Sequence, residues 1–79
     1  MARVLLFGPL RDLAGWRERE VAGGSIAEIR AFLGSEDAEL GAALGASGVQ
    51  VAVDQAIVRG DASLGARSEV AFLPPMSGG

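Results

Sequence analysis

The sequence predicts an α+β domain in which a mixed sheet of about four to five strands packs on one main helix. Short apolar or alternating runs bounded by Gly and Pro indicate the strands, and one segment of helical periodicity indicates the helix. The predicted order is strand, strand, helix, a second short helix, and then strands to the end. The 79 residues, 49% of them hydrophobic, suffice for one domain with one core.

The first quarter of the chain contains two predicted strands around a helical turn. Residues 2–7, "ARVLLF", are apolar and stop at Gly8-Pro9, so they predict the first strand. Residues 10–15, "LRDLAG", predict a helical turn that ends at Gly15. Residues 16–21, "WREREV", predict a second strand with its charges on a face in water.

The main helix has the strongest local signals. Ser25 and Glu28 have the spacing of a capping box, in which the Ser hydroxyl accepts from an amide of the first turn and Glu28 reaches back. The apolar stripe that follows comprises Ile26, Ile29 and Leu33. Gly34 predicts the end of this helix, and "SEDAELGAALGASG" predicts a short, weak helix that ends near Gly45.

The second half of the chain reads as strands and a loop. Residues 49–53 alternate, with the valines on one face, and Asp54-Gln55 predicts a turn into a return strand over residues 56–58. Residues 59–68 predict a loop. In the last strand, residues 69–73, Val70 and Phe72 share one face while Ala71 and Leu73 share the other.

Composition excludes several classes of function. The net charge is −3, and the seven basic residues, all arginine, are scattered, which disfavours a nucleic-acid partner. The chain has no His and no Cys, so soft metal sites and Ser-His or Cys-His nucleophiles are unavailable. No apolar run approaches a membrane span, and "MARVLLFGP" is short for a signal peptide, so we expect a cytoplasmic protein with no membrane partner.

The chain ends in "PPMSGG", which predicts a domain over residues 1–73 and an extended tail over residues 74–79. The two prolines stiffen the exit from the last strand, and six extended residues reach roughly 20 Å. Glycines without a Cβ allow the backbone to enter a narrow channel. A terminal carboxylate delivered in this way becomes a good electrophile once it is joined to AMP, and sulfide or a persulfide can then convert it to a thiocarboxylate.

Three segments resemble the small-subunit family of molybdopterin synthase, a family of ubiquitin-like sulfur carriers: "VLLFGPLRDLAG" (4–15), "VAVDQAIV" (51–58) and "SEVAFLPPMSGG" (68–79). The resemblance implies a β-grasp fold with the two end strands side by side in the middle of the sheet. It also implies a ubiquitin-activating-type adenylyltransferase that spends ATP on Gly79, a sulfur donor enzyme, and no cofactor bound to the chain itself. The thiocarboxylate then donates sulfur to cyclic pyranopterin monophosphate in the large synthase subunit, within a heterotetramer. The chain would not be an enzyme on its own.

The resemblance also implies roles for particular residues. Gly79 bears the sulfur and Gly78 provides clearance. The expected partner-binding residues are Gly78, Ser77, Met76, Pro75, Pro74, Leu73, Phe72, Phe7, Arg11 and Ile57. Adjacent strand residues point to opposite faces, so we expect Phe72 in the core and Leu73 outward. By base rates Phe7 is a core residue, and Arg11 as a solvated residue of a helical turn is an equal alternative.

Other functions stay open at this point. A sulfur carrier for thiamine thiazole synthesis also ends in Gly-Gly, and a protein modifier would join its C-terminus to lysines of targets. A plain binding module would use a sheet edge and leave the tail inert. Deletion of Gly78 and Gly79 should abolish the three covalent functions and leave the fourth intact.

Overall fold

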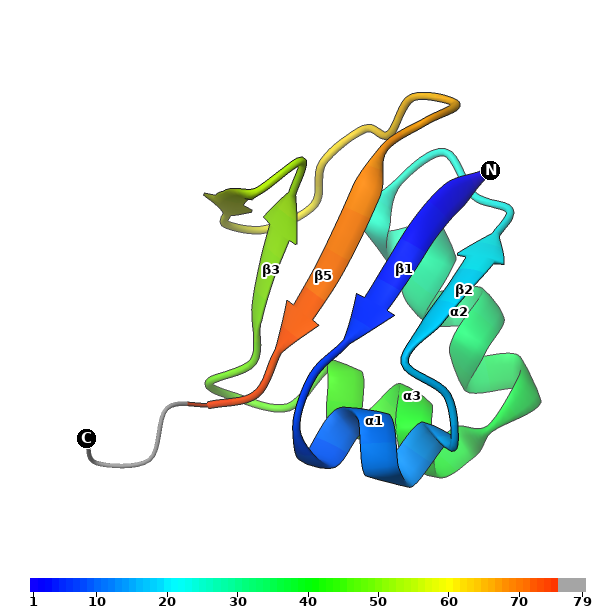
Figure 1. Cartoon of the computed structure of the whole chain (residues 1–79), viewed down its shortest axis with the longest axis vertical. Coiled ribbons are helices and arrows are strands. Elements are labelled where there is room, and N and C mark those ends of the chain that lie inside the picture. The colour runs from blue at the N-terminus through cyan, green and yellow to red at the C-terminus, as the bar shows by residue number, and fades with distance from the viewer. Residues whose placement is uncertain (76–79) are drawn as a thin grey trace.

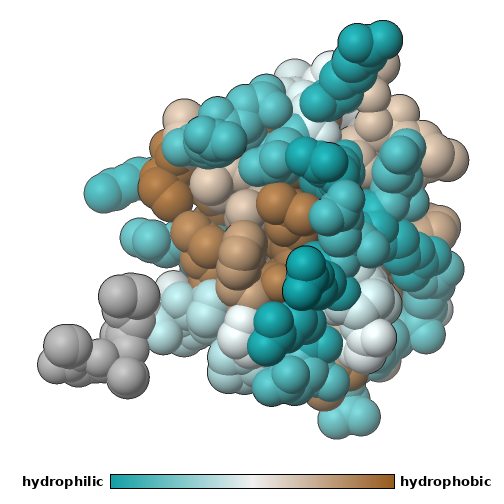
Figure 2. All heavy atoms as spheres, viewed as in Figure 1, coloured by the Kyte–Doolittle hydropathy of each residue, from teal (hydrophilic) through white to brown (hydrophobic). Residues whose placement is uncertain are grey.

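The computed structural model describes residues 1–75 and consists of a five-stranded mixed sheet with helices on one side. The strands are β1 (Ala2–Leu6), β2 (Glu18–Val21), β3 (Gln50–Val53), β4 (Ala56–Val58) and β5 (Glu69–Leu73). The helices are α1 (Pro9–Ala14), α2 (Ile26–Glu36) and α3 (Ala38–Leu44). Figure 1 shows α2 behind the sheet with α1 and α3 at its lower end, and Figure 2 shows the face that they leave open.

The strand order is β2-β1-β5-β3-β4, and it confirms the predicted topology. β1 and β5 lie side by side in the middle and run parallel, with Val4 opposite Val70. The other three pairings are antiparallel. Because the first and last strands pair at the centre of the sheet, the fold closes only when both ends of the domain are in place.

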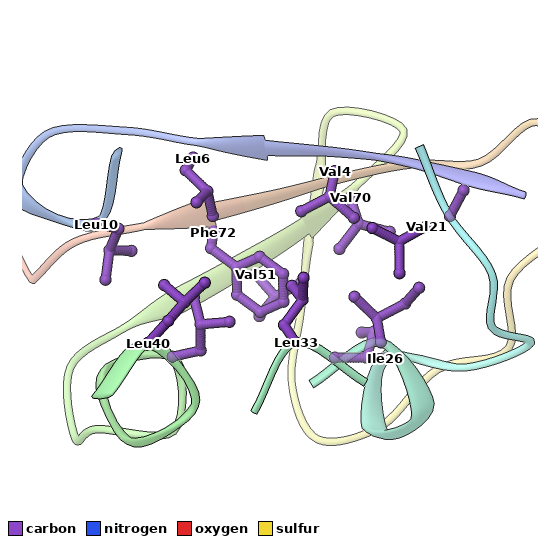
Figure 3. Close-up of a cluster of buried hydrophobic side chains, with 13 residues drawn as sticks. Val4, Leu6, Leu10, Val21, Ile26, Leu33, Leu40, Val51, Val70 and Phe72 are labelled. Atoms are coloured by element: carbon purple, nitrogen blue, oxygen red, sulfur yellow. The ribbon is translucent and has the colours of Figure 1, made fainter. Parts of the chain in front are cut away.

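The core lies between the sheet and the helices (Figure 3). Alternation puts Val4, Leu6, Val70 and Phe72 on the helix-covered face, and each is at most 2% exposed. Ile26, Ile29, Leu33, Leu40 and Leu44 of α2 and α3 meet them, each at most 2% exposed. The Phe72 ring lies between the strands and the helices, among these side chains. The predicted facing of the last strand is therefore confirmed.

The predicted start of the main helix is also confirmed. Ser25 Oγ accepts from the amide of Glu28 at 3.1 Å. Glu28 reaches back to the amide of Gly24, one residue before the cap, at 2.8 Å. Asp61 in the loop after β4 accepts from the amide of Ala27 at 2.9 Å. A distant loop thus satisfies a donor of the first turn that the helix itself leaves without a partner.

The predicted end of this helix is wrong, because α2 continues through Gly34 to Glu36. Gly34 lies where α2 and α3 come closest: a Cβ on Gly41 would be 2.6 Å from the Gly34 Cα. The glycine therefore permits close packing of two helices and does not end one. Asp37 separates them, since it follows α2 and its carboxylate accepts from the amide of Leu40 at 3.2 Å as the cap of α3.

The remaining elements lie within two residues of their predicted bounds. Asp54 and Gln55 form the β3–β4 turn with positive φ angles of 49° and 71°, the backbone of a two-residue hairpin loop. The predicted second strand, residues 16–21, is shorter in the structure: β2 covers only its last four residues, and Trp16 and Arg17 precede it. Phe7 follows β1 and Val49 precedes β3.

Candidate functional site

The open face of the sheet carries a continuous row of apolar side chains. Leu5 pairs with Ala71, Ala71 pairs with Ala52, and Ala52 pairs with Ile57, so the row crosses β1, β5, β3 and β4. We call these four residues the apolar row. Ile57 is 52% exposed. Figure 2 shows apolar side chains gathered over the middle of this face. Among residues 1–75, no helix covers this face; Ala71 and Ala52 are 7% and 8% exposed, so Leu5 and Ile57 provide most of the surface that the row presents.

The tail begins at the end of β5 with Pro74 and Pro75, which we call the tail root. A Cβ on Gly8 would be 3.3 Å from Pro74 Cγ, and a Cβ on Gly48 would be 2.9 Å from Pro75 Cβ. Both glycines have positive φ angles, 57° and 91°. Two turns, one after β1 and one before β3, thus hold the tail root by close contact. Met76, Ser77, Gly78 and Gly79 lie outside the described residues.

Phe72 and Leu73 occupy opposite faces of β5. Phe72 is fully buried, whereas Leu73 is half-buried on the open face, opposite Gln50. The Phe72 side chain cannot touch a partner without unfolding the core. We therefore correct its place among the partner-binding residues: it supports the strand, and Leu73 is the residue on the surface.

Phe7 and Arg11 border one recess of about 340 Å³ at the same end of the open face. Its lining residues are Leu5, Leu6, Phe7, Arg11, Arg17 and Glu18. Phe7 is 43% exposed, so it is a surface residue and not part of the core. Arg11 Nε is 3.9 Å from Asp12 Oδ1, an exposed contact with its sequence neighbour that leaves the guanidinium accessible. Ile57 is on the same face but at the β4 edge.

The opposite end of the open face is charged, with one arginine among three glutamates. Arg3 donates to Glu69 at 2.9 Å and lies 3.6 Å from Glu18. Its strand neighbour is Glu20. The hydrogen bond to Glu69 raises the pKa of Arg3 above its ordinary value. We call Arg3, Glu18, Glu20 and Glu69 the charged end; Glu18 pairs with Leu5 and also lines the recess beside Phe7, so the charged end adjoins that recess.

Sequence reasoning missed several residues of this surface. Leu5 and Ala71 join the apolar row, and Arg17 joins the recess beside Phe7. Alternation along β1 could have placed Leu5 beside Phe7, since both are odd-numbered positions facing away from Val4 and Leu6. Nothing local indicated that Gly8 and Gly48 contact the tail root.

The described residues offer no grouped set of metal ligands. Within residues 1–75 no three His, Cys, Asp or Glu side chains are grouped to hold a metal ion. In the same part of the chain, no helix has the length and apolar character that crossing a membrane requires. What the arrangement offers is an apolar surface beside an anchored, stiff tail root, which suits docking and delivery.

Comparison with known proteins identifies the family. The chain is 33% identical to the molybdopterin synthase sulfur carrier subunit of Escherichia coli (strain K12), over all of both chains. It is similar in structure to small archaeal modifier protein 1 from Methanosarcina acetivorans, with a TM-score of 0.87, 22% identity, and coverage of 99% of this chain and 95% of that one. The protein of the same name from Haloferax volcanii gives a TM-score of 0.79 at 22% identity, covering 99% and 98%. These two likenesses show the ubiquitin-like fold. The family model of the ThiS family matches residues 4–79, and the chain belongs to the ThiS family.

Proposed function

We propose that this chain is the sulfur-carrying subunit of a molybdopterin synthase. One observation carries the proposal: the central strand β5 runs directly into the packed tail root and on to a Gly-Gly end. The full-length similarity to the Escherichia coli sulfur carrier subunit supports it. A strand held on both sides gives the tail a firm base from which to deliver a reactive terminus.

The proposed chemistry takes place at the carboxylate of Gly79. An adenylyltransferase of the ubiquitin-activating type joins it to AMP, and pyrophosphate leaves. Hydrosulfide then displaces AMP and leaves a thiocarboxylate. A persulfide can displace AMP instead and form an acyl disulfide. A thiol then cleaves the sulfur–sulfur bond, which leaves the thiocarboxylate and a disulfide. In the large synthase subunit, the thiocarboxylate sulfur displaces an oxygen leaving group from a carbon of cyclic pyranopterin monophosphate and forms a thioester. Water then cleaves the acyl–sulfur bond, which leaves the sulfur on the pyranopterin and returns Gly79 to the carboxylate. ATP is used by the activating enzyme, and this chain binds no cofactor.

The apolar row, Phe7, Arg11 and Leu73 are the proposed contacts with the large subunit. They surround the end of the sheet from which the tail emerges, so docking there directs the tail into the partner. The large subunit supplies the catalytic side chains, which this chain lacks among His, Cys and Lys. Two such pairs form the proposed heterotetramer, in the cytoplasm.

The test is tandem mass spectrometry of the C-terminal peptide. The full chain is incubated with ATP, a sulfide source and extract of its host, and then trapped with an alkylating agent. An alkylated sulfur localised to Gly79 is the expected result. Fragmentation is essential because oxidation of Met76 adds nearly the same mass as exchange of oxygen for sulfur.

The control is the chain that lacks Gly78 and Gly79, which should carry no alkylated sulfur. An unmodified Gly79, in extract that loads a known carrier, would overturn the proposal. Addition of the large subunit and the pyranopterin then separates molybdopterin synthesis from thiazole synthesis. Stable adducts on lysines of other proteins would instead support a protein modifier.

A further inference from the structure

A second recess lies at the sheet edge formed by β3 and β4, where α2 meets that edge. It has a volume of about 310 Å³. Its lining residues are Arg30, Val49, Gln50, Val51, Ile57, Val58, Arg59 and Gly60. Val51 pairs with Val58, and Val51 faces the core, so these two valines give the recess an apolar wall beside Arg30. Two arginines from distant parts of the chain border one small space with mixed polar and apolar walls, which we call the arginine recess.

Arg30 is the more constrained of the two. Its guanidinium carbon is 6.0 Å from the centroid of the Phe72 ring, over its face, so the cation packs on a core side chain. The Arg30 Nε is buried and has no hydrogen-bond partner within residues 1–75. A buried donor without an acceptor is costly, and native proteins rarely leave one. An acceptor that enters the recess would remove this cost.

Arg59 is exposed and brings a second guanidinium group to the lining of the same recess. Neither Arg30 nor Arg59 forms an ion pair in the described part of the chain, whereas Arg3, Arg11 and Arg19 lie 2.9, 3.9 and 2.7 Å from carboxylate oxygens. No acidic residue lines the recess. In a chain of net charge −3, two arginines without carboxylates at one recess are a local excess of positive charge.

The acids nearest in sequence to Arg59 already have partners. Asp54 accepts from the amide of Glu69 at 2.9 Å. Asp61 accepts from the amides of Ala27 and Ala62, each at 2.9 Å. Both carboxylates therefore support backbone turns, and neither lines the recess or forms an ion pair with Arg30 or Arg59.

We propose that the arginine recess binds the phosphate group of a small phosphorylated molecule. A guanidinium binds an oxyanion side-on through Nε and one Nη, which would give the buried Arg30 Nε its acceptor. One guanidinium group is enough to pair with both oxygens of a carboxylate, whereas a phosphate dianion has enough oxygens and charge to pair with two guanidinium groups. The apolar walls from Val49, Val51 and Val58 leave space for the rest of the molecule. This site does not depend on the proposed sulfur chemistry.

The experiment follows the arginine Nε–H resonances of the full chain by NMR while inorganic phosphate or adenosine 5′-monophosphate is added. The Arg30 resonance should shift and saturate. Arg59→Gln should raise the dissociation constant at least about tenfold, because it removes a charge-assisted contact. Arg67→Gln makes the same change of charge at an exposed residue outside the recess, and it should change the constant less than about twofold.

Saturable binding of inorganic phosphate alone, or tighter binding of the nucleotide, supports the site and distinguishes the two sources of the phosphate group. Equal binding of glutarate would overturn the choice of phosphate. A shift that does not saturate, or one that Arg59→Gln and Arg67→Gln weaken equally, would overturn the site. Because Arg30 packs on Phe72, Arg30→Lys is tested by thermal unfolding: phosphate should raise the midpoint of the wild type more than that of this variant.

Discussion

The two ends of the open face are built on the same strands and yet differ in chemistry. At the charged end, Arg3 on β1 lies opposite Glu69 on β5. Two residues further along, Leu5 lies opposite Ala71 and begins the apolar row. Two residues along a strand span only about 7 Å. The change from charged to apolar therefore occurs within one step of the pleat on both central strands.

This difference indicates which end meets a partner. Arg3 pairs with Glu69 and lies near Glu18 within the domain, and exposed ion pairs contribute little to stability. The apolar row gains only when another surface covers it, since apolar area removed from water is the main source of association energy. The tail root leaves the sheet at the apolar end, so the proposed docking surface and the start of the tail lie in the same half of the face.

The largest expected effect separates the two faces of β5. Phe72→Ala should lower the free energy of unfolding by about 3–5 kcal/mol, because it empties the centre of the core. Leu73→Ala, one residue away on the open face, should cost about 1 kcal/mol or less. Denaturant unfolding monitored by circular dichroism measures both values. Similar losses for the two variants would contradict the assigned facing of the strand.

Charge placed on the apolar end tests the comparison directly. Leu73→Asp and Ile57→Asp should each raise the dissociation constant for the proposed large subunit at least about tenfold, because a carboxylate would be buried without a partner. Arg3→Gln makes the same change in net charge at the charged end and should change it less than about twofold. Titration calorimetry measures binding, and circular dichroism checks the fold. If Leu73→Asp unfolds the domain, Leu73 is a core residue; if Arg3→Gln weakens binding as much, the division of the face is wrong.

Much of this fold was predictable because its signals are local. The alternation of residues 69–73 gave the facing of Phe72 and Leu73, and the spacing of Ser25 and Glu28 gave the start of α2. The prediction that α2 ends at Gly34 was wrong because glycine is common both at the end of a helix and at a close contact between two helices. Only the position of Gly41 on α3 distinguishes the two roles, and that position is set by tertiary packing.

The surface was less predictable for the same reason. The pairing of Leu5 with Ala71 joins residues 66 positions apart in the chain (71 − 5), and only the strand order sets its register. Arg30 and Arg59 come together across α2 and the β3–β4 edge, which no spacing in the sequence reveals. Position within a strand is a local property, whereas membership of a surface depends on which strands are neighbours.

A pair of glycine substitutions measures the contact between the Gly48 turn and the tail root, with Gly60 as the control that has no such contact. Gly60→Ala should destabilise the domain by about 1 kcal/mol, because its φ of 73° strains any residue with a Cβ although the space around it is open. Gly48→Ala has a φ of 91° and also brings a Cβ 2.9 Å from Pro75, so it should cost about 1 kcal/mol more. Denaturant unfolding of the two variants isolates the contact with the tail root. Equal losses would mean that Pro75 moves aside freely.

The smallest expected effect concerns an ion pair away from the open face. Arg19 on β2 donates two hydrogen bonds to Glu36 at the end of α2, at 2.7 and 3.0 Å. The hydrogen bond from Arg19 lowers the pKa of the Glu36 carboxyl below its ordinary value. The folded state thus favours the carboxylate, so the stabilisation is present above the unfolded pKa of about 4.3 and is lost as the pH falls through the lower folded pKa.

Glu36→Gln should therefore lower the free energy of unfolding at pH 7, and the difference from the wild type should vanish in acid. Denaturant unfolding at pH 7, 5 and 3, as about the range that spans the titration, measures it. The effect should be small because both side chains are exposed, as they are for Arg3 and Glu18 at the charged end. A loss that is equal at all three pH values would show that Glu36 acts through packing. The same pH series on Glu69→Gln would then decide whether the ion pair of Arg3 with Glu69 at the charged end contributes through charge or through packing.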